Sequence, residues 1–222
     1  MSLASFIDHT ILKNTTTVAD IDKICQEAIK FGFAAVCVPP YFVQDAKKLV
    51  ESTPVKLATV IGFPFGYHHY QTKLEEARKA IEEGADELDL VMNLAAFKSN
   101  DLAYVETEAE NISTLTHQHG KTLKIIIESG LLSNEEIVRC CDLYKHYPVQ
   151  FLKTSTGFAE KGASIEAVQL MRKYLPDNIR IKASGGIRTL EFASQLVEAG
   201  ATRLGCSASI AIVRGETATG SY

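Results

Sequence analysis

Short runs of β-branched and other apolar residues alternate with amphipathic stretches along the whole chain. Apolar runs of about four to eight residues are typical of strands, and apolar residues spaced three and four apart indicate helices. The pattern predicts eight strands, at Ile7–Thr10, Ala34–Pro39, Leu57–Gly62, Glu87–Asn93, Lys124–Glu128, Phe151–Thr156, Ile179–Ser184 and Arg203–Ser207. Helical spacing fills the intervals, as in residues 18–29 before Gly32, and Ser133 with Glu136 forms the sequence pattern of a capping box.

Strand and helix alternate about eight times within 222 residues, which favours an α/β fold, a single (β/α)8 TIM barrel. A doubly wound dinucleotide-binding fold would place a GxGxxG turn after the first strand, and none stands there. No linker rich in proline or serine interrupts the pattern. We therefore expect one domain over residues 1–222, with residues 215–222 as a mobile C-terminal tail.

The charges and the start of the chain narrow the choice of partner. The net charge is −4 and both signs are interspersed, so no basic stripe or polybasic tail points to nucleic acid or to an anionic membrane. The first residues lack the features of a secretion signal, and the uncharged run 57–67 is too short to span a bilayer. We expect a soluble, cytoplasmic protein that binds a small molecule.

The cysteines and histidines do not form the pattern of a metal site. The odd number of cysteines and the lack of a CxxC motif argue against disulfides and zinc and indicate a reducing compartment: Cys25, Cys37, Cys140, Cys141 and Cys206. Residues 68–69 and 117–119 contain histidine pairs without carboxylate or cysteine at ligand spacing. We interpret these histidines as surface residues and expect no metal.

Two lysines inside apolar strand runs are the strongest chemical signal. Lys153 and Lys182 are separated by 29 residues with one helical pattern between, which matches a βαβ unit whose strands usually lie side by side. An ammonium beside another ammonium has a depressed pKa, and a neutral lysine is a nucleophile for carbonyl carbon. The alternative for either lysine alone is a salt-bridged strand residue near the barrel floor, but two in matched contexts favour metal-independent carbonyl chemistry.

Alternation along the strands adds further candidates, because every second residue of a barrel strand faces the lumen. Asp89 shares the inward face of its strand and could act as an acid/base partner of the lysines or as a simple ion pair. Lys124, also inward, begins its run and is expected to cap the floor. Asp8 could bind substrate or merely close the first strand. Cys37 could line the site or pack as a small buried residue.

Two glycine-containing turns follow the last two strands. Gly185 and Gly186 precede Arg188 and open a helix, while Gly205 and Ser207 end the next strand. Many barrels hold a phosphate with the loops after strands seven and eight. One such turn alone is common in any barrel, but two on successive strands favour an anion site.

Four segments together resemble deoxyribose-phosphate aldolase: Phe6–Lys13, Val60–Gly66, Phe151–Gly157 and Lys182–Thr189. The resemblance spans essentially the whole chain. It implies a class I aldolase without cofactor or metal, which reversibly cleaves 2-deoxy-D-ribose 5-phosphate to D-glyceraldehyde 3-phosphate and acetaldehyde. It also implies that Lys153 forms the Schiff base, that Lys182 perturbs it and that Asp89 takes part in proton transfer.

The resemblance extends to substrate binding and assembly. The family's phosphate loops match Gly157, Gly185, Gly186, Gly205 and Ser207, and we add Thr156, Arg188, Asp8 and Cys37 as candidate substrate-binding residues. The chain ends in Tyr222, as in relatives whose terminal tyrosine assists proton transfer at the acetaldehyde methyl carbon. Ala208 and Phe158 depart from residues that some relatives place near the phosphate, which we expect to weaken phosphate binding. A homodimer is expected.

Two other functions remain open from the sequence. One is an aldolase of the same mechanism that acts on another phosphorylated sugar. The other is a sugar-phosphate-binding barrel without catalysis. The paired lysines argue against the second, because a pure binding protein has no reason to lower a lysine pKa.

Overall fold

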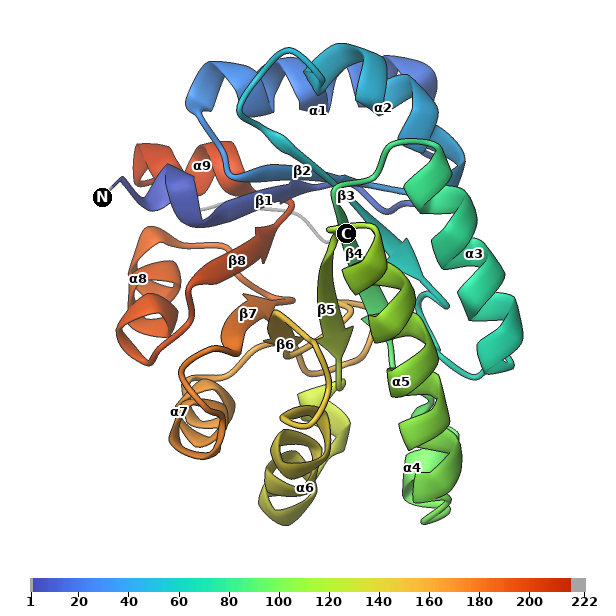
Figure 1. Ribbon diagram of the computed structural model, residues 1–222. Helices are drawn as coiled ribbons and strands as arrows, with labels where there is room; N and C mark the ends of the chain where they lie inside the picture. The colour runs from blue at the N-terminus through green and yellow to red at the C-terminus, as the bar shows by residue number, and fades with distance from the viewer. Residues whose placement is uncertain (1, 217–222) are drawn as a thin grey trace.

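The computed structural model describes residues 2–216 and shows eight parallel strands closed into a barrel. The strands follow one another around the barrel in sequence order, and β8 pairs with β1. They are β1 (Ile7–Thr10), β2 (Ala35–Val38), β3 (Lys56–Ile61), β4 (Glu87–Val91), β5 (Thr122–Ile126), β6 (Phe151–Lys153), β7 (Arg180–Ser184) and β8 (Arg203–Cys206). Helices surround the strands (Figure 1). The predicted barrel is confirmed, and every predicted strand overlaps an observed one.

The helices of the described residues are α1 (Val18–Phe31), α2 (Val43–Val50), α3 (Tyr70–Glu82), α4 (Leu94–Lys98), α5 (Leu102–Gln118), α6 (Asn134–Tyr144), α7 (Ile165–Tyr174), α8 (Leu190–Glu198) and α9 (Ser209–Arg214), with short 3₁₀ helices at Leu3–Phe6, Pro40–Phe42 and Ser129–Leu131. The predicted capping box of Ser133 and Glu136 starts α6. Gly32 ends α1 in the left-handed conformation, at φ 66°, which favours glycine. Within residues 2–216 no helix is long and apolar enough to cross a membrane.

Alternate strand residues face two different cores, as the sequence predicted. Leu88 and Leu90 of β4 pack with helix residues in the large outer core. A smaller apolar cluster lies on the inward positions of the first strands and is formed by Leu12, Ala35, Cys37, Ala58 and Val60. The inward positions of the later strands carry charged side chains instead. The lumen is therefore apolar over β2 and β3, and it is charged at Asp8 of β1 and over β4–β8.

The N-terminal ends of the strands close the barrel floor. The Phe151 ring lies 4.0 Å from the guanidinium carbon of Arg180 and 5.4 Å from that of Arg203. Arg203 also forms ion pairs with Glu87 at 3.0 Å and with Asp8 at 2.6 Å. With the floor filled in this way, small molecules approach the charged lumen from the C-terminal ends of the strands, where barrel active sites lie.

Several strands end earlier than the sequence predicted, and at the ends of two of them, β6 and β4, side chains take over backbone hydrogen bonds. Strand β6 ends at Lys153, after which the Thr154 hydroxyl donates to Ser184 O at 3.2 Å and accepts from Ser184 N–H at 3.1 Å. Strand β4 ends at Val91, whose carbonyl accepts from the Lys73 ammonium at 2.9 Å. These exchanges let the chain leave the sheet at the barrel mouth.

Gly215 and Glu216, the first two residues of the predicted C-terminal tail, are held at the end of α9. Gly215 adopts the left-handed conformation, at φ 72°, and Glu216 N–H donates to Ala211 O at 2.8 Å, so both residues terminate α9. Residues 217–222, including Tyr222, lie outside the described residues.

Candidate active site

Two lysines and one aspartate meet inside the barrel. Lys153 on β6 and Lys182 on β7 are partners in the strand register. Their Nζ atoms lie 2.8 and 2.7 Å from the same Asp89 oxygen, Oδ2. All three residues are buried, with exposed fractions of 3% for Lys153 and 0% for Lys182 and Asp89. The shared inward face predicted from strand alternation is therefore confirmed.

Lys124 is a third lysine of this cluster. It contacts the barrel floor, as predicted, but its ammonium also reaches the centre of the lumen. Its Nζ lies 2.6 Å from Glu87 Oε2, at the floor, but also 2.7 Å from Asp89 Oδ1. The register explains this reach, because Lys124 of β5 is paired with Asp89 of β4. Lys124 thus links the floor to the centre of the lumen.

Asp8 lies in the same network, directly bonded to Lys182. Its carboxylate also binds Arg203 at 2.6 Å, and the residue has no exposed surface. Burial alone would raise the pKa of Asp8, but Lys182, Lys124 and Arg203 outweigh that effect and hold the pKa far below its usual range. Asp8, a predicted substrate-binding residue, is therefore fully occupied by cations.

The described lumen network contains more cations than carboxylates: Lys124, Lys153, Lys182 and Arg203 face Asp8, Glu87 and Asp89. Burial lowers the pKa of Lys153, and repulsion from Lys182 lowers it further against the attraction of Asp89. Burial also opposes the charge of Lys182 and Lys124, but nearby carboxylates outweigh it and raise both pKa values. Lys153 is thus the amine of this network that most readily becomes neutral.

The loops above β6 and β7 lie against each other at Gly185, where there is no room for a side chain. A Cβ on Gly185 would lie 3.0 Å from Gly162 Cα and 3.2 Å from Gly157 Cα. Gly186 has φ 76° and open space beside it. Residues after β7 and β8 line one small cavity of about 30 Å³, formed by Gly186, Ile187, Arg188, Gly205, Cys206, Ser207 and Ala208. The structure thus brings Gly186, Arg188, Gly205 and Ser207 to one cavity, whereas Gly157 and Gly185 do not line it.

Gly205 has an additional steric role. A Cβ at this position would lie 2.9 Å from Ser184 Cβ and 3.2 Å from Lys182 Cε. Contacts below about 3 Å force a neighbour to move, so the missing side chain leaves the space through which Lys182 extends toward Asp89.

Thr156 binds Glu128, the last residue of the predicted strand Lys124–Glu128, which the sequence analysis did not single out. The Thr156 hydroxyl donates to Glu128 Oε2 at 2.5 Å, and Thr156 N–H donates to Oε1 at 3.2 Å. Burial raises the pKa of Glu128 in spite of these bonds and of nearby Lys153. Its place at the end of an inward-facing strand row was the signal that could have identified it.

Cys37 lies beside the lysines but is closed off. Its exposed fraction is 1%, and it packs with Ala35, Ala58 and Val60 in the inner apolar cluster. Burial raises the pKa of its thiol to about 11, with a further contribution from Asp89. Of the two alternatives from the sequence, this position favours the small buried residue.

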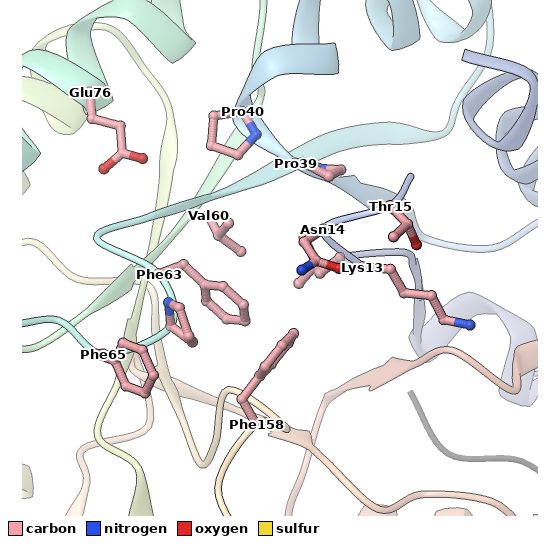
Figure 2. Close-up of a pocket in the computed structure, with 12 residues that line it drawn as sticks. Lys13, Asn14, Thr15, Pro39, Pro40, Val60, Phe63, Phe65, Glu76 and Phe158 are labelled. Carbon is pink, nitrogen blue, oxygen red and sulfur yellow. The ribbon is translucent and has the colours of Figure 1, made fainter. Parts of the chain in front are cut away.

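Two larger hollows flank the mouth of the barrel. One, of about 670 Å³, lies over the first three strands, and Figure 2 shows Lys13 and Glu76 on opposite sides of it. The other, of about 480 Å³, lies over β4–β6 and includes Val91, Ile126, Glu128 and Thr156. Phe158 lines both hollows and packs edge-to-face on Phe63, with ring centroids 5.2 Å apart. The wall between the hollows is therefore aromatic.

Comparison with known proteins identifies the family to which this barrel belongs. The profile of the DeoC/LacD family of aldolases matches residues 3–214. The chain belongs to this aldolase family. A deoxyribose-phosphate aldolase of Caldicellulosiruptor saccharolyticus is 47% identical over 212 residues, which cover 95% of this chain and 96% of that protein. One of Thermococcus gammatolerans is 48% identical over 217 residues, which cover 97% and 96%.

Solved structures agree with this family assignment. A tetrameric deoxyribose phosphate aldolase of Aeropyrum pernix superposes with a TM-score of 0.89 at 33% identity, over 96% of this chain and 89% of that one. An orotidine 5′-phosphate decarboxylase of Pyrococcus horikoshii, at 16% identity and a TM-score of 0.66, shares the fold alone. The resemblance stated from the sequence is confirmed, and the chain is an aldolase.

The described residues of the aldolase offer no candidate metal site. Residues 2–216 contain no group of three or more histidine, cysteine or acidic side chains placed to hold a metal ion. His9, which the strand pattern places outside the lumen, contacts Glu27 Oε2 and Ser209 Oγ, both at 2.9 Å. It is a satisfied core histidine that joins β1 to α1 and α9.

Proposed function

We propose that this chain catalyses the reversible aldol cleavage of 2-deoxy-D-ribose 5-phosphate to D-glyceraldehyde 3-phosphate and acetaldehyde through a Schiff base on Lys153. Relatives with this activity in their names cover the whole barrel at 47% and 48% identity. The observation that carries the mechanism is the contact of Lys153 and Lys182 with one carboxylate oxygen, in a buried network with a surplus cation. Such a network favours a neutral amine at Lys153.

The steps follow from carbonyl chemistry. Neutral Lys153 attacks C1 of the open-chain sugar, and loss of water gives an iminium ion. Removal of the proton from the C3 hydroxyl then breaks the C2–C3 bond, releases glyceraldehyde 3-phosphate and moves two electrons into an enamine. Protonation of the enamine carbon and hydrolysis release acetaldehyde and restore the amine. The same groups run the addition in reverse.

Asp89 and Asp8 are assigned mainly to hold the amines in place. Burial would raise the pKa of Asp89, but Lys124, Lys153 and Lys182 hold it well below the usual range. Asp89 therefore stays ionised near neutral pH, where it orients Lys153 and could order water for proton transfer. Asp8 supports Lys182 from below, which makes it a positioning residue in this proposal.

The phosphate is assigned to the backbone of Gly157, Gly185, Gly186 and Gly205, with Ser207, Arg188 and Thr156 close by. Backbone N–H groups in glycine loops can approach a phosphate closely because no Cβ intervenes. Tyr222 is assigned to proton transfer at the methyl carbon of acetaldehyde. Its test is deuterium exchange into acetaldehyde, which Tyr222→Phe should slow without preventing Schiff-base formation.

The main test is borohydride reduction in the presence of acetaldehyde, followed by peptide mass mapping. A two-carbon adduct on Lys153 supports the proposal, and Lys153→Met should lose both the adduct and the activity while the fold persists. Lys23→Met, on the exposed face of α1, is the matched control and should behave like the wild type. An adduct on Lys182 alone would reverse the two roles, and full activity of Lys153→Met would refute the assignment.

Substrate choice, assembly and location complete the proposal. A panel of phosphorylated and unphosphorylated aldehydes would distinguish the deoxyribose phosphate reaction from that of an aldolase for another sugar phosphate. We propose a homodimer, which light scattering can test against the tetramer named for the Aeropyrum pernix relative. We also propose a cytoplasmic location, in line with five cysteines that are all free and buried.

A further inference from the structure

The Schiff-base mechanism needs a group that gives up a proton, and Asp89 is poorly suited to that step. Loss of water from the carbinolamine requires a proton on the leaving hydroxyl. The cations around Asp89 hold its pKa well below the usual range, so this carboxylate is without a proton near neutral pH. We propose that Glu128 is the catalytic acid for this step, an assignment that rests on the Schiff-base function proposed above.

Glu128 lies at the end of the strand next to Lys153. Ile126 of β5 is the register partner of Lys153, and Glu128 follows two residues later on the same inward face. Its backbone is left-handed, with φ 52°, a conformation that few non-glycine residues adopt without a local reason. Glu128 lines the 480 Å³ hollow, and 6% of its surface is exposed. The same hollow is lined by Ile126, the register partner of Lys153, so the carboxyl group lies at the barrel mouth above the strand pair that carries the lysine.

The hydrogen bonds of Glu128 leave its two oxygens unequal. Oε2 accepts the short bond from the Thr156 hydroxyl, at 2.5 Å, and Oε1 accepts the longer bond from Thr156 N–H, at 3.2 Å. Ser129, the next residue, donates its N–H to Thr154 O at 2.7 Å. This bond holds the turn at Glu128 against the segment that follows Lys153. The less strongly bonded Oε1 is the better place for a transferable proton.

The buried surroundings bring the pKa values of Glu128 and Lys153 closer together. Burial raises the pKa of Glu128, against the opposing effect of nearby Lys153, and burial also lowers the pKa of Lys153. A proton leaving the ammonium can therefore be held as the carboxylic acid at low cost. The other charged groups that line this hollow are Lys98 and Glu160, and Lys98 is held by Glu136 at 2.7 Å.

The proposed step balances atoms and charge. The Lys153 nitrogen has already bonded to the carbonyl carbon, and the carbinolamine hydroxyl takes the proton of the Glu128 carboxyl group. The C–O bond breaks with both electrons on oxygen, water leaves, and the nitrogen lone pair forms the C=N bond. The products are a cationic iminium and an anionic Glu128, which attract each other. Hydrolysis of the iminium returns the proton by the reverse path.

The test compares imine formation in two isosteric variants on the same hollow. Glu128→Gln keeps an oxygen for Thr156 but cannot donate a carboxyl proton, whereas Glu160→Gln removes a carboxylate outside the proposed chemistry. We expect borohydride trapping of acetaldehyde on Lys153 to slow by about 100-fold in Glu128→Gln, the lower range for general acid catalysis, and to be unchanged in Glu160→Gln. Glu128→Ala should be accelerated by added formate, which supplies the missing acid.

The outcomes separate this inference from the Schiff-base proposal. If Glu128→Gln is folded and forms the adduct at the wild-type rate with an unchanged pH profile, the assignment of Glu128 is wrong while the Schiff base stands. A slow Glu128→Ala that formate does not accelerate would also overturn it, because a merely structural loss is not rescued by an acid. If the wild type forms no adduct, the Schiff-base proposal itself fails.

Discussion

Lys153 and Lys182 donate hydrogen bonds to one and the same oxygen of Asp89, at 2.8 and 2.7 Å. Two buried ammonium groups at a single oxygen repel each other, and the second Asp89 oxygen is already bound by Lys124 at 2.7 Å. Lys182 has a further carboxylate in Asp8, to which it is directly bonded. The proton is therefore most easily lost from Lys153, the lysine without this second partner.

Lys182→Met should move the activity to higher pH. The variant removes a positive neighbour of Lys153 and frees Asp89 to attract it, so the pKa of Lys153 rises. The neutral amine is the reactive form, so activity appears as pH rises through the pKa of Lys153. A higher pKa therefore shifts the onset of activity to higher pH. We expect a loss of at least about 100-fold near neutral pH, partly recovered in alkali, from the pH dependence of kcat/KM. An acidic limb that stays in place would contradict this account of Lys182.

Gly205→Ala tests the space left for Lys182. The added methyl would lie 2.9 Å from Ser184 Cβ and 3.2 Å from Lys182 Cε, so the Lys182 side chain must shift. We expect kcat to fall about 10-fold or more while the fold survives, because small displacements of reacting groups are costly. Gly32→Ala, at a helix end with open space around it, is the control and should affect stability without affecting kcat. Equal kcat in both variants would count against the steric role.

Asp8→Asn should reduce the change in the free energy of unfolding between neutral and acidic pH. The folded pKa of Asp8 lies below its unfolded value, so its contribution is present above about pH 4 and is lost as pH falls toward the folded pKa. Removing one partner of a buried ion pair costs about 3–5 kcal/mol at neutral pH. Urea unfolding at pH 7 and pH 3 should therefore show a large difference between variant and wild type at pH 7 and a smaller one at pH 3. A difference of the same size at both pH values would exclude this linkage.

A buried ion pair outside the lumen should set the stability of the β4 end. Lys73 and Glu108 are bonded to each other with exposed side-chain fractions of 0% and 1%, and Glu108 also accepts from Asn93 N–H at 3.0 Å. Lys73→Met leaves Glu108 buried and unpaired, which should cost about 3–5 kcal/mol of unfolding free energy.

Two further variants make the Lys73 result specific. Adding Glu108→Leu to Lys73→Met should recover part of the loss, because the unpaired charge is gone. Lys79→Met breaks an exposed pair with Glu83 on the same helix and should change stability by less than about 1 kcal/mol. Chemical denaturation of the four proteins measures these differences, and a Lys79→Met loss as large as that of Lys73→Met would mean that burial is not the cause.

Strand alternation allowed much of the site to be predicted, and its failures have physical causes. The inward positions of Asp89, Lys153 and Lys182 follow from a local two-residue period that does not depend on the rest of the chain. The role of Lys124 was underestimated because a lysine side chain is long enough to reach beyond its own layer. The partner of Glu128 could not be predicted, because Thr156 lies in the loop after β6, beyond the regular strand pairing.

The sequence by itself determined the eight strands, their inward faces and the family, since these depend on local periodicity and on contiguous motifs. Only the tertiary structure decided which charges pair and which buried lysine has its pKa lowered. Asp8, Asp89 and Lys182 lie far apart along the chain, and closure of the barrel through the pairing of β8 with β1 brings them into one buried network. In that dry interior the energy of each charge depends on its immediate neighbours, so protonation at Lys153 is a property of the closed barrel.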